Sequence, residues 1–331
     1  MEKYNTENYE SAVDRNFNVG FSIVMPSYNH GRFIASAIDS ILNQKYKNVE
    51  IIVMDGGSTD DTVKILKSYQ ERIRWVSEKD NGQSDAICKG FKLATKEWFT
   101  WLNSDDFQNG NALLHVKNAI EQNPDAKVIV GRGHYTDEHG NYMRDYPTVK
   151  AGPNADICRE FFIKGYVAQP SVYYHRDVYF KVGGVNPDMQ FTMDYDLWVR
   201  MAHTGCCFAE VSEDISGNRW YETTKTASQL LPLLSEVVRV QKREYGKVSP
   251  YYVQAISDHI FSVIHANNPE NKHHLRYRII YFKSVWFLLN CHRPMYCICG
   301  LLKANIALSG PIKADKLTFV KMCKLFKNKL F

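Results

Sequence analysis

Three short polar clusters in the first third of the chain carry side chains that could bind a phosphorylated ligand. Each follows an apolar run, and they span residues 27–29 (Ser-Tyr-Asn), 55–58 (Asp-Gly-Gly-Ser) and 103–106 (Asn-Ser-Asp-Asp). The paired acids Asp105 and Asp106 offer hard oxygen ligands for a divalent ion, which in turn binds phosphates. A single acid pair could equally cap a helix. Three clusters in succession, each ending an apolar run, favour a binding site.

The first two clusters have the chemistry to hold a nucleotide base. Pro26 cannot donate to a strand ladder and so marks the end of a strand, and Tyr28 offers a flat ring on which a base can stack. Asp55 could accept hydrogen bonds from a nucleobase or ribose, and Gly56 and Gly57 beside it let the backbone approach a ligand closely. The alternative for each residue is a structural turn or a helix cap.

A second acid pair lies far downstream, in the segment 191–202 (FTMDYDLWVRMA). Asp194 and Asp196 precede the apolar positions of an expected helix. Asp194 could serve as a general base, whereas Asp196 is better placed to cap the helix. The alternative is that both acids cap it.

The elements that must position these clusters alternate between strand and helix. Short apolar runs predict buried strands, and the segments between them show helical spacing of apolar residues. This alternation predicts an α/β fold with a mostly parallel central sheet flanked by helices, in which ligands bind at the carboxyl ends of the strands. The expected strands are 21–27, 49–57, 73–78 and 98–103, and the expected helices are 31–44, 62–70 and 84–94. A further helix is expected after Asp196, with Leu197, Trp198, Met201 and Ala202 at its apolar positions.

Length and composition indicate a globular protein of about two domains. The chain has 331 residues, of which 44% are hydrophobic, and this composition excludes intrinsic disorder as the main state. The net charge of +5 is unevenly distributed. Residues 1–225 hold 25 Lys/Arg and 31 Asp/Glu, whereas residues 271–331 hold 12 Lys/Arg and one acid, Asp315. We therefore expect a neutral or acidic body and a basic tail that meets a polyanion.

The basic tail contains apolar, aromatic-rich segments at 277–290, 294–310 and 316–331. None has 18 consecutive apolar residues, which disfavours a membrane-spanning helix. Two interpretations, mutually compatible, stay open: amphipathic helices docked on an anionic membrane surface, or a helical subdomain packed on the body with its lysines in solvent. The tail's charge would also permit nucleic-acid binding, but no recognised motif supports a specific nucleic-acid partner.

The termini set the expected domain division and location. Residues 1–19 are polar and lack the apolar core of a signal peptide, so we expect a cytoplasmic protein, peripheral on the cytoplasmic face of the membrane. The body is expected over 20–225. Residues 226–331 are expected to form a helical, basic C-terminal extension.

Three stretches resemble family 2 glycosyltransferases, a large inverting family with the GT-A fold. They are PSYNHGRFIASAIDSILNQKYKNVEIIVMDGGSTDDT (26–62), SEKDNGQSDAICKGFKLATKEWFTWLNSDD (77–106) and AQPSVYYHRDVYFKVGGVNPDMQFTMDYDLWVR (168–200). The resemblance covers roughly 20–225, and the GQSDA and LNSDD variants are similar to bacterial enzymes that build surface polysaccharides and glycolipids.

The resemblance implies roles residue by residue. Asp105 matches the last acid of the family's DxD motif, which binds Mg²⁺ or Mn²⁺ on the diphosphate, and Asp106 is taken with it as a metal ligand. Asp194 matches the catalytic base of the ED motif. The nucleotide-sugar site is expected at Pro26, Tyr28, Asn29, Asp55, Ser58, Asp85, Asn103, Ser104 and Arg219. Acceptor contacts are expected from Tyr166, Gln169, Tyr173 and Trp198.

Three positions depart from the family pattern. Asn103 occupies the first DxD position, so an amide could make a ribose or metal contact there. Met193 replaces the Glu that precedes the base. The family's Arg-x-His is represented by Arg219-Trp220-Tyr221, in which Arg219 could still contact phosphate.

The implied activity is a metal-dependent single displacement with inversion. Asp194 would take the proton of an acceptor hydroxyl, and the ion would neutralise the departing diphosphate. A UDP-sugar is the favoured donor, and a glycan or lipid-linked molecule of cell-surface polysaccharide synthesis is the expected acceptor.

Two other classes stay open. A nucleotidyltransferase would be expected to carry a Gly-rich, basic loop after the first strand, and PSYNHGRF is a poor match to such a loop. The other is a non-catalytic nucleotide-sugar or polyanion-binding protein on a degenerate GT-A fold.

Overall fold

The computed structural model describes residues 19–152, 154–222 and 229–264, together with 279, 281–283, 285–286 and 289–290. Within these residues the strands form one sheet in the order β3-β2-β1-β4-β8-β6-β9-β5, with β7 paired to β6. The strands are β1 Phe21–Ser27, β2 Val49–Asp55, β3 Arg74–Ser77, β4 Trp98–Trp101, β5 Phe107–Gln108, β6 Ala126–Thr136, β7 Tyr142–Asp145, β8 Val172–His175 and β9 Cys207–Arg219. The α-helices are α1 Ile34–Leu42, α2 Thr62–Ser68, α3 Gln83–Leu93, α4 Ala112–Gln122, α5 Ile157–Ile163, α6 Arg176–Lys181, α7 Met193–His203, α9 Leu230–Tyr245 and α10 Pro250–Ile264.

The four strands expected from the apolar runs are present and parallel. β1 lies between β2 and β4, and its residue Val24 pairs with Ile52 on one side and Trp101 on the other. Every residue of β1 is buried, as expected of a central strand covered on both faces. Because Ser27 is level with Asp55, the first two polar clusters emerge at the same edge of the sheet.

The second half of the sheet contains both parallel and antiparallel pairs. The prediction of a mostly parallel sheet therefore holds for the strands β3, β2, β1 and β4 only. β8 pairs antiparallel with both β4 and β6, whereas β6 and β9 run parallel with register shifts near Gly131 and Arg132. The short strand β5 pairs antiparallel with β9 next to the Asp105/Asp106 loop. This arrangement brings the end of β9, far along the chain, to the third polar cluster.

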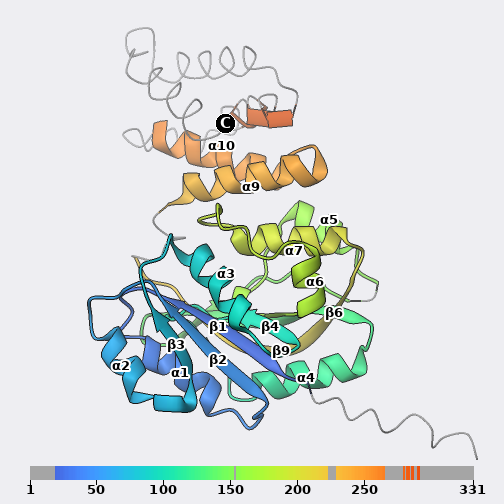
Figure 1. Cartoon of the computed structure of the whole chain (residues 1–331). Helices are drawn as coiled ribbons and strands as arrows, with labels where there is room; N and C mark the ends of the chain where they lie inside the picture. Colours follow the sequence, from blue (N-terminus) through green and yellow to red (C-terminus); the bar gives the residue numbers. More distant parts are fainter. Residues whose placement is uncertain are drawn as a thin grey trace, which may run out of the picture.

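Helices cover both faces of the sheet and define two hydrophobic cores (Figure 1). On one face α1, α2 and α4 contribute Ile38, Leu66 and Val116. On the other face α3 and α7 contribute residues such as Phe91 and Leu197. The α/β fold with helices on both faces is therefore confirmed.

Helices α9 and α10 pack onto the second core and belong to the same compact body. Val237 and Val240 of α9 and Val253 and Ile256 of α10 are buried in the core that contains α7. Figure 1 shows these two helices stacked beyond α5 and α7. The described start of the expected C-terminal extension thus supports the helix that carries Asp194.

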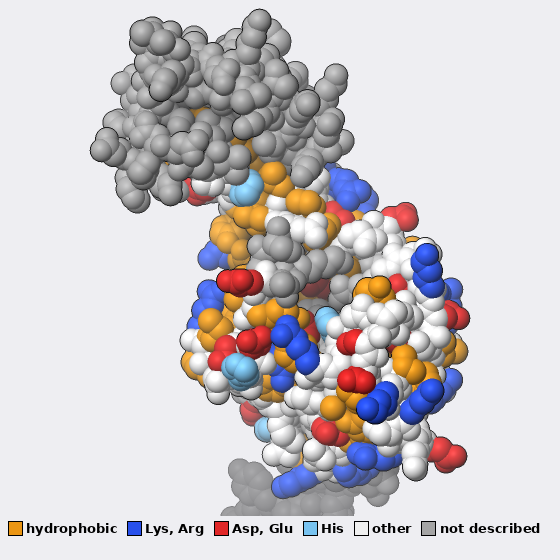
Figure 2. All heavy atoms as spheres, turned by 90° about the vertical axis from the view of Figure 1, so that its left-hand side faces the viewer, with side chains coloured by type: hydrophobic (Ala, Val, Ile, Leu, Met, Phe, Trp, Pro, Cys, Tyr) orange, Lys and Arg blue, Asp and Glu red, His pale blue; other side chains and the backbone are white. Residues whose placement is uncertain are grey.

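The segments 294–310 and 316–331, for which membrane docking is one of two expectations, lie outside the described residues, as does nearly all of the N-terminal segment 1–19. Among the helices that the structure describes, none is both long and apolar enough to cross a bilayer. On the face shown in Figure 2, Lys and Arg are interspersed with Asp and Glu.

Helix α3 approaches the sheet closely because Gly90 has no side chain. A Cβ at this position would lie 2.4 Å from Val24 Cγ1 of β1 and 3.2 Å from Met54 Cγ of β2. We expect Gly90→Ala to lower the free energy of unfolding by about 1–3 kcal/mol, because the added methyl overpacks a core that cannot move aside. Denaturant melts would measure the change. Gly110→Ala is the control, since a Cβ there meets nothing within 4 Å; equal stability of both variants would contradict the close packing.

Candidate active site

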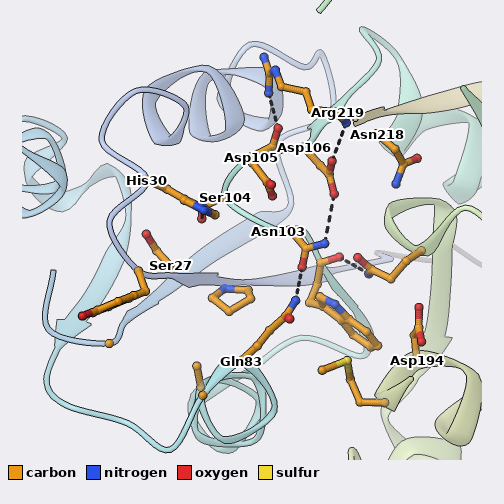
Figure 3. Close-up of a pocket in the computed structure, with 18 of the residues that line it drawn as sticks. Ser27, His30, Gln83, Asn103, Ser104, Asp105, Asp106, Asp194, Asn218 and Arg219 are labelled. Atoms are coloured by element: carbon orange, nitrogen blue, oxygen red, sulfur yellow. Dashed lines mark hydrogen bonds between the residues drawn. The ribbon is translucent and has the colours of Figure 1, made fainter. Parts of the chain in front are cut away.

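A cavity of about 670 Å³ opens at the edge of the sheet where the polar clusters emerge (Figure 3). Its walls come from the end of β1, the start of α3, the loop after β4, the end of β9 and the start of α7. Of the residues expected in the site, those that line the cavity are Pro26, Tyr28, Asn103, Ser104, Asp105, Asp106, Gln169, Asp194 and Arg219.

A chain of hydrogen bonds fixes the floor of the cavity (Figure 3). Gln83 Nε2 donates to Asn103 Oδ1 at 2.7 Å, and Asn103 Nδ2 donates to Asp106 Oδ2 at 3.1 Å. The Arg219 backbone N–H donates to Asp106 Oδ1 at 2.9 Å. Asn103, the departure at the first DxD position, therefore orients Asp106 through its amide.

Asp105 and Asp106 differ in their surroundings. Asp106 is 4% exposed, and burial raises the pKa of its carboxyl well above the usual range, with the neighbouring Asp105 charge adding to the effect. Asp105 is half-buried and accepts a hydrogen bond from the Tyr221 hydroxyl at 2.7 Å. Tyr221 stands where the family's His would be, and it orients the carboxylate that lines the cavity.

The donor set suits a metal ion that is completed by substrate. Over the described residues, no three His, Cys, Asp or Glu side chains come together as a ready-made metal site. Mg²⁺ commonly binds through one or two protein carboxylates plus phosphates of the substrate. Asp105 and Asp106 could provide the two carboxylates.

Arg219 crosses from β9 to the Asp105 loop. Its Nη1 donates to the Asp105 carbonyl at 2.5 Å and its Nη2 to Ser36 Oγ at 3.1 Å, while the guanidinium lies over the rings of Phe33 and Phe107. Its Nε is buried without a hydrogen-bond partner in the described structure. Burial lowers the pKa of Arg219 from its usual value, but the guanidinium stays charged. The charged guanidinium is thus held beside the Asp105 loop, at the wall of the cavity.

Asn29, Asp55 and Ser58 form an internal network beside the cavity and do not line it. Asp55 is 2% exposed and accepts hydrogen bonds from Gly57 N, Ser58 N, Ser58 Oγ and Ser77 Oγ. Ser58 Oγ in turn accepts from the Asn29 backbone N–H at 2.7 Å. These bonds hold the β1 and β2 loops together and leave Tyr28 59% exposed at the rim.

Asp85 also lies outside the cavity lining, in the first turn of α3. Its carboxylate accepts from Asn81 N at 3.0 Å and pairs with Lys89 at 3.2 Å. The Asn81 hydrogen bond is the main cause that lowers the pKa of Asp85. Asp85 therefore shapes the loop that precedes α3.

Asp194 lies on a different wall of the cavity from His30 and Ser104 (Figure 3). It is the second residue of α7, and its Oδ1 accepts a hydrogen bond from Tyr195 N at 2.7 Å. Burial raises the pKa of Asp194 to about 6, with smaller contributions from the charges of Glu236 and Asp196. A carboxylate with such a pKa is suited to accept a proton near neutral pH.

Asp196 does not cap α7, contrary to the expectation from its position. It is fully buried and receives Arg200 at 2.6 Å and also Arg243 of α9. Arg200 donates further to the carbonyls of Val182 and Gly184. Asp196 is therefore the centre of an ion cluster that joins α7 to α9.

The expected acceptor residues separate into two groups. Gln169 lines the cavity, donates to the Trp101 carbonyl at 2.8 Å and keeps its buried Oε1 without a partner in the described structure. Tyr166 instead bonds the Tyr251 hydroxyl at 2.7 Å. Tyr173 and Trp198 are 0% and 2% exposed and pack in the two cores, so neither reaches the cavity.

Sequence reasoning missed an aromatic wall made by Tyr135, Tyr146 and Trp220. Tyr135 stacks on Tyr146 with ring centroids 4.6 Å apart and meets Trp220 edge-on at 5.7 Å, and all three line the cavity. It also missed His30, whose Nδ1 lies 2.7 Å from Ser104 Oγ and ties the first loop to the third. The three aromatic residues come from separate segments of the chain. The one sequence signal for a role in the site is that Trp220 directly follows Arg219.

Comparisons with known proteins identify the family of the matched segment. The model of glycosyl transferase family 2 matches residues 22–183. An uncharacterized glycosyltransferase of Rickettsia conorii is 31% identical over 190 residues, which cover 54% of this chain and 31% of the relative. Chondroitin synthase of Escherichia coli is 25% identical over 188 residues, which cover 56% of this chain and 26% of that protein. The chain thus spans between about a quarter and a third of the length of these two curated relatives.

Solved structures share the fold. Residues 1–349 of S. aureus TarS in complex with UDP match with a TM-score of 0.57 and 14% identity, covering 90% of this chain and 93% of that one. The mannosyltransferase PcManGT from Pyrobaculum calidifontis, in complex with GDP-Man and Mn²⁺, matches with a TM-score of 0.53 and 16% identity, covering 96% and 82%. The family model and the relatives show that residues 22–183 belong to glycosyl transferase family 2, and the solved structures show that the chain has the GT-A fold.

Proposed function

We propose that this protein transfers a sugar, with inversion, from a nucleoside-diphosphate sugar to a hydroxyl group of a glycan or lipid-linked acceptor in polysaccharide biosynthesis. The observation that carries the proposal is a single cavity lined by Asp105, Arg219 and Asp194. The first two suit a metal-bound diphosphate. Asp194, with its pKa of about 6, suits an acceptor hydroxyl.

The donor's diphosphate would lie along the floor between Asp105 and Arg219. Asp105 and Asp106 would hold Mg²⁺ or Mn²⁺, which supplies neutralisation of the negative charge on the leaving diphosphate. The positive charge of Arg219 would attract the phosphates, and Tyr28 would stack on the base at the exposed rim. UDP is the favoured nucleotide; TarS and PcManGT, which share the fold, have been solved with UDP and GDP-Man respectively.

The acceptor would enter along the aromatic wall. Sugars pack their apolar C–H faces on aromatic rings, and Tyr146 and Trp220 offer such faces within the cavity that Asp194 also lines. Gln169 Oε1, buried and without a partner in the described structure, would accept a hydrogen bond from a sugar hydroxyl. Asp194 then removes the proton of the attacking hydroxyl as the bond to the leaving diphosphate breaks.

A donor screen tests this proposal. The protein, with Mn²⁺, is incubated with UDP-, GDP- and dTDP-sugars and a panel of glycan acceptors, and release of the nucleoside diphosphate is followed. We expect one donor class to be consumed, and NMR of the product to show the anomeric configuration inverted. Retained configuration would contradict the single displacement. Nucleotide binding without any turnover would favour the non-catalytic alternative, and release of pyrophosphate from a nucleoside triphosphate would favour a nucleotidyltransferase.

A further inference from the structure

Glu236 of α9 is buried against the turn that leads into α7. The residue is only 4% exposed, and a carboxylate is rarely buried to this degree unless it is paired. Its Oε1 accepts a hydrogen bond from Gln190 N at 2.9 Å, and its Oε2 accepts from Phe191 N and Thr192 N, each also at 2.9 Å. Thr192 Oγ1 adds a fourth bond at 3.2 Å. One carboxylate therefore binds three consecutive backbone N–H groups.

These bonds replace a cap that the α7 sequence does not supply. Thr192, the N-cap residue of α7, makes no side-chain cap bond to its own helix, and α7 begins at Met193. A negative charge at this end is also favoured by the helix dipole. The turn that Glu236 holds is followed within two residues by Asp194.

The same turn is held from its other side by the start of α3. Ser84 Oγ donates to the Met189 carbonyl at 2.5 Å, and a Cβ at Gly82 would lie 3.1 Å from Gln190 Oε1. Gly82 and Phe191 both line the cavity. The turn is thus clamped between α9 and a helix of the nucleotide side, and α9 supplies most of its hydrogen bonds.

We propose that Glu236 is a positioning residue for sugar transfer: its carboxylate fixes the 190–192 turn and thereby places Asp194 against the acceptor hydroxyl. This inference rests on the proposed function, because it takes Asp194 as the base. Glu236 itself does not line the cavity and touches no substrate. It acts from α9, beyond the segment 22–183 that matches the family model.

The charge of Glu236 has a second, separable effect on Asp194. The titratable groups that face Asp194 are Asp196 on α7, Tyr146 after β7, Glu236 on α9 and Tyr252 on α10. The negative charge of Glu236 helps to raise the pKa of Asp194, and its removal should lower that pKa. The rising limb of the pH–rate profile should then move to lower pH.

The test compares Glu236→Gln with Glu244→Gln in the full chain. Gln keeps the shape of Glu but turns an amide NH₂ toward backbone donors, so the turn loses at least one bond. Glu244 lies on the same helix and pairs with Arg243 and His203, away from the turn. The readouts are hydrogen exchange of the 190–192 amides, nucleotide affinity, and turnover between about pH 5 and 8 of the UDP- or GDP-sugar that the parent consumes.

In Glu236→Gln we expect faster hydrogen exchange of the amides of residues 190–192 and a kcat about 10- to 100-fold lower. The rising limb of the pH–rate profile should move to lower pH, and nucleotide affinity should stay unchanged. Glu244→Gln should resemble the parent. Exchange and pH profile like those of the parent would overturn the inference. If Glu236→Gln does not fold, Glu236→Asp replaces it. Asp keeps the charge but its side chain is one methylene shorter, so kcat should fall while the rising limb of the pH–rate profile stays in place. A parental kcat would overturn the inference.

The inference can fail or stand independently of the proposed function. If the parent consumes no nucleotide-sugar, the proposed function fails, while the hydrogen-exchange result still shows whether Glu236 holds the turn. A thermal cycle also needs no substrate: Asp194→Asn should stabilise the protein at pH 7.5 less in the Glu236→Gln background than in the parent. Equal stabilisation in the two backgrounds would contradict the electrostatic contact between Glu236 and Asp194.

Discussion

Asp194→Asn is expected to lower turnover by about 10²- to 10⁴-fold, the range in which a general base contributes to catalysis. The amide has nearly the same shape as the carboxylate but cannot take the acceptor proton. Nucleotide affinity should stay unchanged, because the residues proposed to bind the diphosphate are Asp105 and Arg219, which also line the cavity. Steady-state kinetics with the preferred donor would measure the loss, and parental turnover would show that Asp194 is not the base.

The pH dependence of the stability of Asp194→Asn can be measured without substrate and serves as a control. The pKa of Asp194 is raised to about 6, so the folded state holds the proton more tightly than the unfolded state. The parent should therefore lose up to about 2 kcal/mol of stability as pH rises from about 4 to 7, because ionising the partly buried carboxyl destabilises the fold. Asp194→Asn cannot lose this proton, so its melting temperature relative to the parent should rise over that window; a constant difference would contradict the raised pKa.

Asp196→Asn is expected to destabilise the fold by about 3–5 kcal/mol, the usual effect of removing one partner of a buried ion pair. Asp196 is fully buried and receives both Arg200 and Arg243, so the substitution leaves two guanidinium groups without their common carboxylate. The melting temperature should fall by roughly 6 °C or more. Asp188→Asn is the control, since Asp188 is exposed and lies five residues before the start of α7.

The two Asn substitutions in α7 should thus have opposite effects on stability at neutral pH. Asn at 194 should leave the protein inactive and more stable, whereas Asn at 196 should leave it unstable. Equal stability of Asp188→Asn and Asp196→Asn would contradict the ion cluster between α7 and α9.

The parallel half of the sheet was predictable because its strands are continuous apolar runs. Carboxyl ends of parallel strands meet at one edge, so the gathering of Tyr28 and Asp105 followed from the order of the elements alone. The mixed half was not predictable from the same signals. The pairing of β9 with β6, which carries Arg219 to Asp106, depends on contacts between segments far apart in the chain.

Side-chain surroundings were the least predictable part of the site. Tyr173 and Trp198 have the rings expected of a sugar platform, but burial in the two cores removes them from the cavity. Tyr146 has no local pattern that separates it from other tyrosines. Asp196 lies near the start of α7, as a capping residue would. The backbone N–H groups before the helix instead donate to Glu236 of α9, which is distant in the sequence and is placed there by the tertiary fold.

Calorimetric titration with UDP, GDP and dTDP, each with and without Mn²⁺, tests the central claim most directly, because it needs neither the donor sugar nor the acceptor. The account predicts that one diphosphate binds in a Mn²⁺-dependent manner. This binding should be lost in Asp105→Ala, which removes a cavity-lining carboxylate proposed to bind the metal, and kept in Asp125→Ala, which removes an exposed carboxyl outside the cavity. Binding of none of the three, or equal Mn²⁺-dependent binding in Asp105→Ala, would contradict the account.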